Sequence, residues 1–183
     1  DSSESRGLGD VYKRQMCVCL YLGISITKTI KSLNSFFGAS RRFDVYKGIY
    51  INKHNPIIID DYGHHPTEIN STLDTIKNLY PDKKIVMIFQ PHRFSRTKAY
   101  WRLFLDVFRR LDRIILLPTY SAGEKNNSFD SSFIYQKIKN NNKSLLDSID
   151  EVENVLKNIN FDNSVLLLQG AGDIKDIMNI LKR

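Results

Sequence analysis

Short, purely apolar runs alternate with longer amphipathic segments along most of this chain. The apolar runs lie at residues 57–59, 85–89, 114–117 and 165–168. Runs of this kind, without polar alternation, are typical of strands that are buried on both faces. Strands that alternate with helices of about ten or more residues predict a parallel sheet covered by helices on both sides. This pattern therefore constrains the fold more than any other feature of the sequence.

The segments between the runs carry the helical period. Residues 66–79 place four apolar residues from Ile69 to Leu79 on one face, with Pro66 at the first helical position. Further helices are predicted over residues 97–109, 132–139, 150–159 and 174–182. Additional strands are predicted over residues 45–51 and 144–146. The predicted fold class is α/β, a doubly wound, mostly parallel, Rossmann-like sheet with helices on both faces, over residues 43–183.

The first 42 residues follow a different pattern. Residues 1–15 have no apolar period and resemble translated vector or adapter sequence, so we expect a non-native leader. The apolar residues 16–26 follow Lys13 and Arg14 as in a signal peptide, but eleven residues cannot span a bilayer. We expect the end of a buried helix there, then a helix from Thr27 that Gly38 closes. No segment reaches transmembrane length, and no membrane partner is expected.

Composition and charge narrow the class of protein. The 183 residues are 42% hydrophobic and 26% charged, which is typical of one ordinary globular domain. Two cysteines, Cys17 and Cys19, cannot form a disulfide framework or a four-ligand zinc site, so a cytoplasmic location is predicted. The net charge is +7, but no basic run exceeds two residues. Scattered charge argues against a nucleic-acid partner and remains compatible with an anionic substrate.

Polar residues gather where the predicted strands end. Residues 60–65 follow the first apolar run, residues 90–96 the second, residues 119–124 the third and residues 169–173 the fourth. Three of the four histidines lie in the first two loops. In a doubly wound fold the carboxyl ends of the strands meet at one edge of the sheet, where ligands bind. The sequence therefore predicts one polar site of mixed charge at this edge.

The side chains in these loops limit the kinds of ligand that the site could bind. Arg93 and Arg96 can clamp a carboxylate or phosphate. Asp61 can accept hydrogen bonds from ribose hydroxyls or an amine, and a neighbouring histidine can relay a proton near neutral pH. The sequence contains neither a G-x-S-x-G elbow nor a G-x-x-x-x-G-K-[ST] phosphate loop. Residues 170–172, Gly-Ala-Gly, predict a tight strand-to-helix turn, since Lys175 stands where a dinucleotide motif needs its third glycine.

A hydrolytic alternative remains open at this point. The adjacent carboxylates Asp60 and Asp61 and the adjacent imidazoles His64 and His65 could ligate two metal ions, as in a metal-dependent phosphoesterase. Each pair also has a structural interpretation, as a helix cap or as a surface pair.

Several ordered motifs resemble those of the Mur ligase family. Residues 60–68 resemble the signature that opens the C-terminal domain of the family, and residues 89–97 resemble its second signature. Residues 120–124 and 169–174 match two more, and residues 41–43 resemble the join between the central and C-terminal domains. The resemblance implies that residues 16–42 are the tail of a central ATP-binding domain. Residues 43–183 are then the C-terminal ligase domain.

The resemblance implies an ATP-dependent, amide-bond-forming ligase of peptidoglycan synthesis. The motifs are most similar to those of the member that joins L-alanine to the lactyl carboxylate of UDP-N-acetylmuramate through an acyl phosphate. The family member that attaches a recycled tripeptide is expected to lack the stretch Gln-Pro-His-Arg at residues 90–93. ATP and Mg²⁺ are implied, with the phosphate loop and metal ligands in a central domain that this chain largely lacks, together with the whole N-terminal domain. The chain alone is therefore expected to be inactive.

The resemblance also assigns roles to single residues. Arg42 and Asp61 resemble the positions that hold the ATP ribose and approach its phosphates. Four residues resemble the positions on the amino-acid and acyl-phosphate side: Tyr62, His64, Arg93 and Arg96. The implied catalytic residues are Arg93, which offsets charge on the tetrahedral intermediate, and His64, which orients the amine. No residue of the chain is expected to ligate a metal.

Overall fold

The computed structural model describes residues 15–34, 40–125 and 128–182. The chain divides into two compact units, Asp1–Ala39 and Ser40–Arg183. All of the predicted leader except its last residue, Gln15, lies outside the described residues, as does Gly38, the residue expected to close the first helix.

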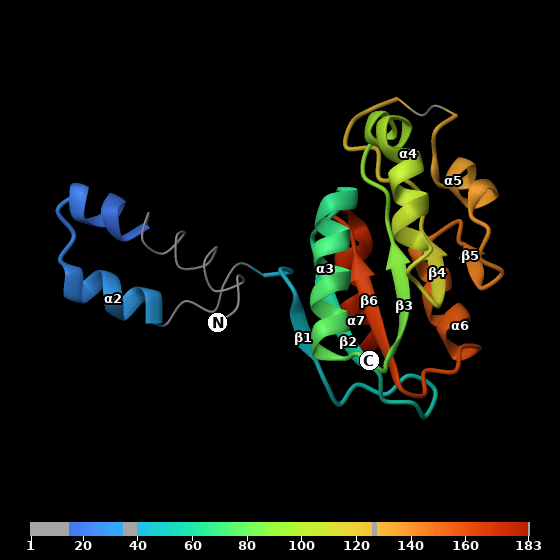
Figure 1. The fold of residues 1–183 in the computed structure, drawn as a ribbon, viewed down its shortest axis with the longest axis horizontal. Coiled ribbons are helices and arrows are strands. Elements are labelled where there is room, and N and C mark those ends of the chain that lie inside the picture. Colours follow the sequence, from blue (N-terminus) through green and yellow to red (C-terminus); the bar gives the residue numbers. More distant parts are fainter. Residues whose placement is uncertain (1–14, 35–39, 126–127, 183) are drawn as a thin grey trace. The chain divides into compact units, whose positions relative to one another are not determined.

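The larger unit is built on a six-stranded sheet of order β1-β2-β6-β3-β4-β5 (Figure 1). Its strands are β1 (Asp44–Tyr46), β2 (Ile57–Asp61), β3 (Lys84–Phe89), β4 (Arg113–Leu116), β5 (Lys143–Leu145) and β6 (Ser164–Gln169). Strand β1 runs antiparallel to β2, whereas every other neighbouring pair is parallel. The predicted class, a mostly parallel, doubly wound α/β sheet, is confirmed.

Helices cover both faces of this sheet. The helical elements are α3 (Pro66–Leu79), α4 (Phe94–Phe108), α5 (Ser131–Lys137), η1 (Ile149–Glu151), α6 (Val152–Lys157), η2 (Asp173–Asp176) and α7 (Ile177–Leu181). One core cluster joins α3, α4 and α5 to strand residues such as Ile59 and Leu167. The other joins α6 and α7 to Ile58 and Leu166. Successive residues of one strand thus enter opposite cores, which explains the unbroken apolar runs.

Some element boundaries differ from the predictions. The strand predicted over residues 45–51 ends at Tyr46, because Gly48 adopts a left-handed conformation (φ +79°) and Ile51 pairs only with His54. Helix α4 begins at Phe94, three residues before its predicted start. The last two predicted helices each begin as a 3₁₀ turn, η1 and η2.

The smaller unit contains helical residues 15–21 and helix α2 (Ile26–Asn34). The expectation of a buried helix over residues 16–26 is wrong, since Val18, Tyr21 and Leu22 are more than half exposed. Two short helices are too small to cover an apolar run on every side. Among the residues that the structure describes, no helix is both long and apolar enough to cross a bilayer.

Candidate active site

Four strand ends meet at one edge of the sheet. The register places Asp61 of β2 beside Gln169 of β6, Gln169 beside Phe89 of β3, and Phe89 beside Leu116 of β4. The four polar loops therefore start from a single row of residues. The predicted convergence of these loops is confirmed.

A cluster of rings and a guanidinium forms between three of these loops. The ring centroid of His64 lies 5.4 Å from that of Tyr62 and 5.1 Å from that of His92. The ring of His92 stacks on Tyr120 at 5.5 Å. The Nη1 atom of Arg96 lies 3.1 Å from His92 Nδ1. Tyr62, His64 and Arg96 are thus brought together around His92, which the sequence analysis did not single out.

The donors and acceptors in this cluster define the tautomers of both histidines. His64 Nδ1 lies 3.1 Å from the carbonyl oxygen of Tyr62, which can only accept. Nδ1 of His64 therefore carries a proton, and its Nε2 is an acceptor when the ring is neutral. His92 has the opposite arrangement, because the Arg96 guanidinium can only donate.

Arg93 stands at the start of α4 in a strained backbone conformation, with φ 71° and ψ 134°. Its N–H donates to the Tyr120 carbonyl at 2.8 Å, and its own carbonyl accepts from Thr97 N–H at 3.2 Å. Strain of this kind persists only where the surroundings hold it, and it clusters at functional sites. The backbone contacts thus fix Arg93 at the edge where the polar loops meet, with its side chain exposed.

Glu124 caps α4 from the loop after β4. Its carboxylate accepts from both the backbone N–H, at 2.9 Å, and the hydroxyl of Ser95. These hydrogen bonds, with the charge of Arg93, hold the pKa of Glu124 below its usual range. The residue at the helix start, Arg93, makes no capping bond with its side chain, so a distant loop supplies the cap.

A hollow of about 320 Å³ lies beside this cluster. Its lining consists of Arg42, Asp61, Tyr62, Gly63, Glu68, Ser71 and Thr72. The two residues that the resemblance links to ATP, Arg42 and Asp61, therefore both line this hollow. Its volume is at the lower end of the range for small-molecule sites, roughly 300–1,000 Å³.

The carboxylate of Asp61 already has several donors. Its Oδ1 accepts from Gln169 Nε2 at 2.7 Å, Gly63 N–H at 2.9 Å and Thr72 Oγ1 at 3.3 Å. Its Oδ2 accepts from Phe43 N–H at 3.0 Å. Asp61 thus fixes the loop after β2, and its Oδ2 has fewer donors than its Oδ1.

Asp60 and His65 have structural partners of their own. Arg41 Nε lies 3.0 and 3.1 Å from the two oxygens of Asp60, and Arg41 Nη2 donates to the Gly170 carbonyl. Burial raises the pKa of Asp60, and the Arg41 charge offsets this only in part. The His65 side chain caps α3 by accepting from Thr67 N–H. Arg41 is a second residue that the sequence analysis did not single out.

The geometry gives no support to the metal-dependent phosphoesterase. The four proposed ligands, Asp60, Asp61, His64 and His65, have the other partners described above. Across residues 15–34, 40–125 and 128–182, no group of three or more His, Cys, Asp or Glu side chains is placed to hold a metal ion.

The glycine turn after β6 packs against the loop after β3. Gln90 Oε1 accepts from Ile174 N–H at 3.0 Å. Gly170 has φ +146°, and a Cβ there would lie 2.9 Å from the Gln90 carbonyl oxygen. The predicted tight turn is confirmed, and Gly170 permits the close approach of two backbones.

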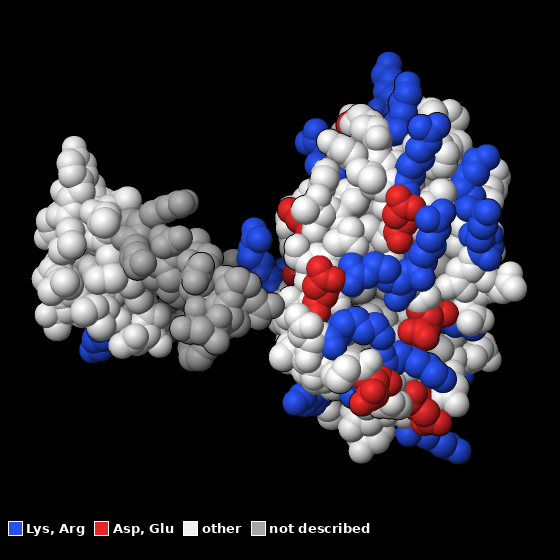
Figure 2. All heavy atoms as spheres, viewed as in Figure 1, with Lys and Arg blue, Asp and Glu red and all other residues white. Residues whose placement is uncertain are grey.

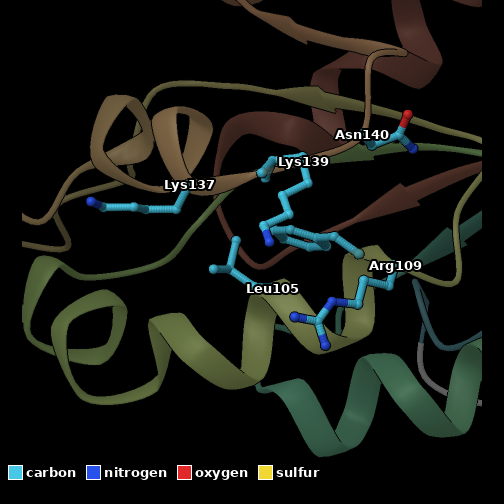
Figure 3. Close-up of a pocket in the computed structure, with 7 residues that line it drawn as sticks. Leu105, Arg109, Lys137, Lys139 and Asn140 are labelled. Carbon is cyan, nitrogen blue, oxygen red and sulfur yellow. The ribbon is translucent and has the colours of Figure 1, made fainter.

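A second hollow lies at the opposite edge of the sheet, where α4 ends. It has a volume of about 90 Å³, and Leu105 and Phe108 contribute to its apolar lining (Figure 3). Two of the three cations in its lining have partners, since Arg109 pairs with Asp106 and Lys137 lies over the Phe133 ring. On the face drawn in Figure 2, basic side chains are interspersed with acidic ones.

Comparison with known proteins settles the family. The sequence profile described as "Mur ligase, glutamate ligase domain" matches residues 41–172. The chain belongs to the Mur ligase family. The UDP-N-acetylmuramate–L-alanine ligase of Francisella philomiragia is 41% identical over 181 residues, and its namesake in Hydrogenovibrio crunogenus is 37% identical over 161 residues. These alignments cover 96% and 86% of the chain, but only 39% and 35% of the two relatives.

Two solved Mur ligase structures share the fold of this chain. The Thermotoga maritima UDP-N-acetylmuramate–alanine ligase, MurC, superimposes with a TM-score of 0.63 at 27% identity, covering 91% of this chain and 35% of that enzyme. A murein peptide ligase from Psychrobacter arcticus also reaches 0.63, over 91% of this chain and 34% of its own, but at 19% identity it supports the Mur ligase fold alone.

Proposed function

We propose that this chain is the C-terminal, amino-acid-binding domain of an ATP-dependent ligase that joins L-alanine to the lactyl carboxylate of UDP-N-acetylmuramate through an acyl phosphate. The names of the two curated relatives support this substrate pair. The observation that carries the proposal is the contact of Arg96 with His92, whose ring in turn contacts His64, the neighbour of the Tyr62 ring. A carboxylate and an amine can both be held there.

The domain organisation is part of this proposal. Residues 43–183 form the C-terminal ligase domain, and residues 16–42 form the tail of a central ATP-binding domain. The start of the second compact unit at Ser40 and the start of the family match at residue 41 support a boundary close to these positions. The partners of the chain are then the remaining N-terminal and central domains.

In the proposed reaction, guanidinium groups hold the carboxylate of L-alanine. Arg93 and Arg96 present planar sets of donors that fit a carboxylate, and fixing it orients the amine for attack on the acyl phosphate. An arginine at this place also offsets the negative charge of the tetrahedral intermediate. His64 accepts a hydrogen bond from the amine through Nε2, since its Nδ1 donates to the Tyr62 carbonyl.

The proposed contacts with ATP come from residues that line the hollow beside the cluster. Arg42 approaches the phosphates, and Asp61 Oδ2 accepts from a ribose hydroxyl. ATP supplies the phosphoryl group that activates the lactyl carboxylate. The two carboxylates that line the hollow, Asp61 and Glu68, are both engaged by hydrogen bonds within the domain. We assign Mg²⁺ and the phosphate loop to the central domain.

Titration of the 183-residue chain with L-alanine, followed by ¹⁵N–¹H NMR, tests the proposal. We expect weak, saturable shifts confined to residues 62–65 and 92–97. Arg96→Met should weaken binding about tenfold or more, because a charge-assisted hydrogen bond contributes roughly 1.5–3 kcal/mol. Arg109→Met, at the opposite edge of the sheet, is the matched control and should bind as the wild type does. Shifts that Arg96→Met leaves unchanged would contradict the assignment.

A further inference from the structure

We infer that His92 is a positioning residue of this site: its neutral ring holds the Arg96 guanidinium in the orientation that binds an anion, and protonation of the ring releases it. The identity of the anion, the carboxylate of L-alanine, rests on the proposed function. The orientation of Arg96 itself does not.

The first observation is the pair of acceptors that His92 offers to Arg96. Nη1 of Arg96 lies 3.1 Å from His92 Nδ1 and 3.1 Å from the His92 carbonyl oxygen. Both hydrogens of Nη1 are thereby engaged by a single residue one helical turn earlier. The Nε–H and Nη2–H groups of Arg96 form the parallel fork that binds a carboxylate with two hydrogen bonds. His92 therefore fixes one side of the guanidinium and leaves the fork for a ligand.

The second observation is that the ring of His92 itself contacts two other rings. Tyr120 stacks on it with an interplanar angle of 23°, and His64 lies across it at 42°. Backbone hydrogen bonds join the loop after β3 to the loop after β4. Tyr120 N–H donates to Pro91 O and Arg93 N–H donates to Tyr120 O, each at 2.8 Å. The loops after β2, β3 and β4 thus all contribute to the orientation of Arg96.

Charges around His92 favour its neutral form. His64 faces it from the loop after β2, Arg93 and Arg96 from the start of α4, and Glu124 from the loop after β4. Burial, followed by the three basic neighbours, lowers the pKa of His92, and only Glu124 opposes the shift. At neutral pH the ring is therefore uncharged, and Nδ1 is free to accept.

The positioning role predicts a pH dependence of definite sign. When the pH falls through the pKa of His92, Nδ1 gains a proton and repels Arg96, so anion binding should weaken. A histidine that acted only through its charge would strengthen anion binding on protonation. The two roles are therefore separated by the direction of the change.

Two substitutions of similar polarity test the role in the 183-residue chain. In His92→Asn the amide oxygen takes the place of Nδ1 and does not titrate, whereas in His92→Gln the amide reaches the place of Nε2. We expect ¹⁵N NMR to show the proton on Nε2 of wild-type His92 at about pH 7.5. Rotation of the Arg96 Nη1 group should be slow in the wild type and in His92→Asn, and fast in His92→Gln.

Binding of L-alanine supplies the second readout. As the pH falls, its dissociation constant should rise more steeply in the wild type than in His92→Asn, and the difference between the two reports the contribution of His92. In His92→Gln the dissociation constant should be raised roughly fivefold or more at every pH. A proton on Nδ1, tighter binding on protonation, or equal behaviour of the two variants would overturn the inference. The expected tautomer and Arg96 rotation without any L-alanine shift would support the role of His92 and count against the proposed function alone.

Discussion

At the scale of single residues, Gly170 connects two loops of the site through backbone packing. Its φ of +146° is a conformation that side chains rarely adopt, and a Cβ would lie 2.9 Å from the Gln90 carbonyl oxygen. Gly170→Ala should lower the free energy of unfolding by about 2–3 kcal/mol. Gly123 also has a positive φ, +86°, but a Cβ there meets nothing within 4 Å.

Gly123→Ala is therefore the matched control for strain without a close contact, and it should cost about 1 kcal/mol. Urea unfolding of both variants measures the difference. Equal losses would show that the packing of Gly170 on Gln90 contributes nothing to stability.

The sequence predicted the loops of the site better than it predicted the contacts of each side chain. Motifs identified Asp61, Tyr62, His64 and Arg96, whose residue types fit the chemistry. The structural role of Arg41 was not predicted, because its partners Asp60 and Gly170 are separated from it by 19 and 129 residues in the sequence. His92 carried a readable signal, its i,i+4 spacing from Arg96, but spacing alone does not reveal which atom accepts.

At the scale of elements, α3 depends on a reciprocal cap at its start. Glu68 accepts from the N–H groups of His64 and His65, each at 2.9 Å, while the His65 ring accepts from Thr67. Burial raises the pKa of Glu68, but these hydrogen bonds and the charges of the two histidines outweigh it and lower the pKa overall.

Glu68→Ala should therefore cost about 0.5–1 kcal/mol of stability at neutral pH. Because the folded-state pKa lies below the unfolded value, this contribution is present above about pH 4.5 and is lost as the pH falls through the folded pKa. Urea unfolding of the wild type and of Glu68→Ala across this range measures it. A difference between the two that stayed constant down to about pH 2 would contradict the assigned role.

Strands and helices were predictable where burial alone decides them. The apolar runs correspond to β2, β3, β4 and β6. A strand that is covered on both faces is apolar at nearly every position, so an unbroken apolar run identifies it in the sequence. The short β1 and the 3₁₀ starts of the last two helices were not predictable. Their limits depend on a left-handed glycine and on tertiary pairing rather than on local period.

At the scale of the whole molecule, both cores belong to the second unit. Of the described residues, none before Phe43 contributes to either cluster. The chain 40–183 should therefore unfold cooperatively in urea with the same free energy of unfolding as the 183-residue chain, within about 0.5 kcal/mol. A clearly lower midpoint for the shorter chain, measured by circular dichroism, would show that residues 1–39 stabilise the larger unit.

The most direct test of the central claim is a chimera. Residues 41–183 would replace the aligned C-terminal part of the Francisella philomiragia ligase, and ADP release would be measured with UDP-N-acetylmuramate and L-alanine present. We expect release that requires both substrates and that Arg96→Met abolishes, while the 183-residue chain alone, which lacks a phosphate loop, releases none. A folded chimera with no L-alanine-dependent release would contradict the account.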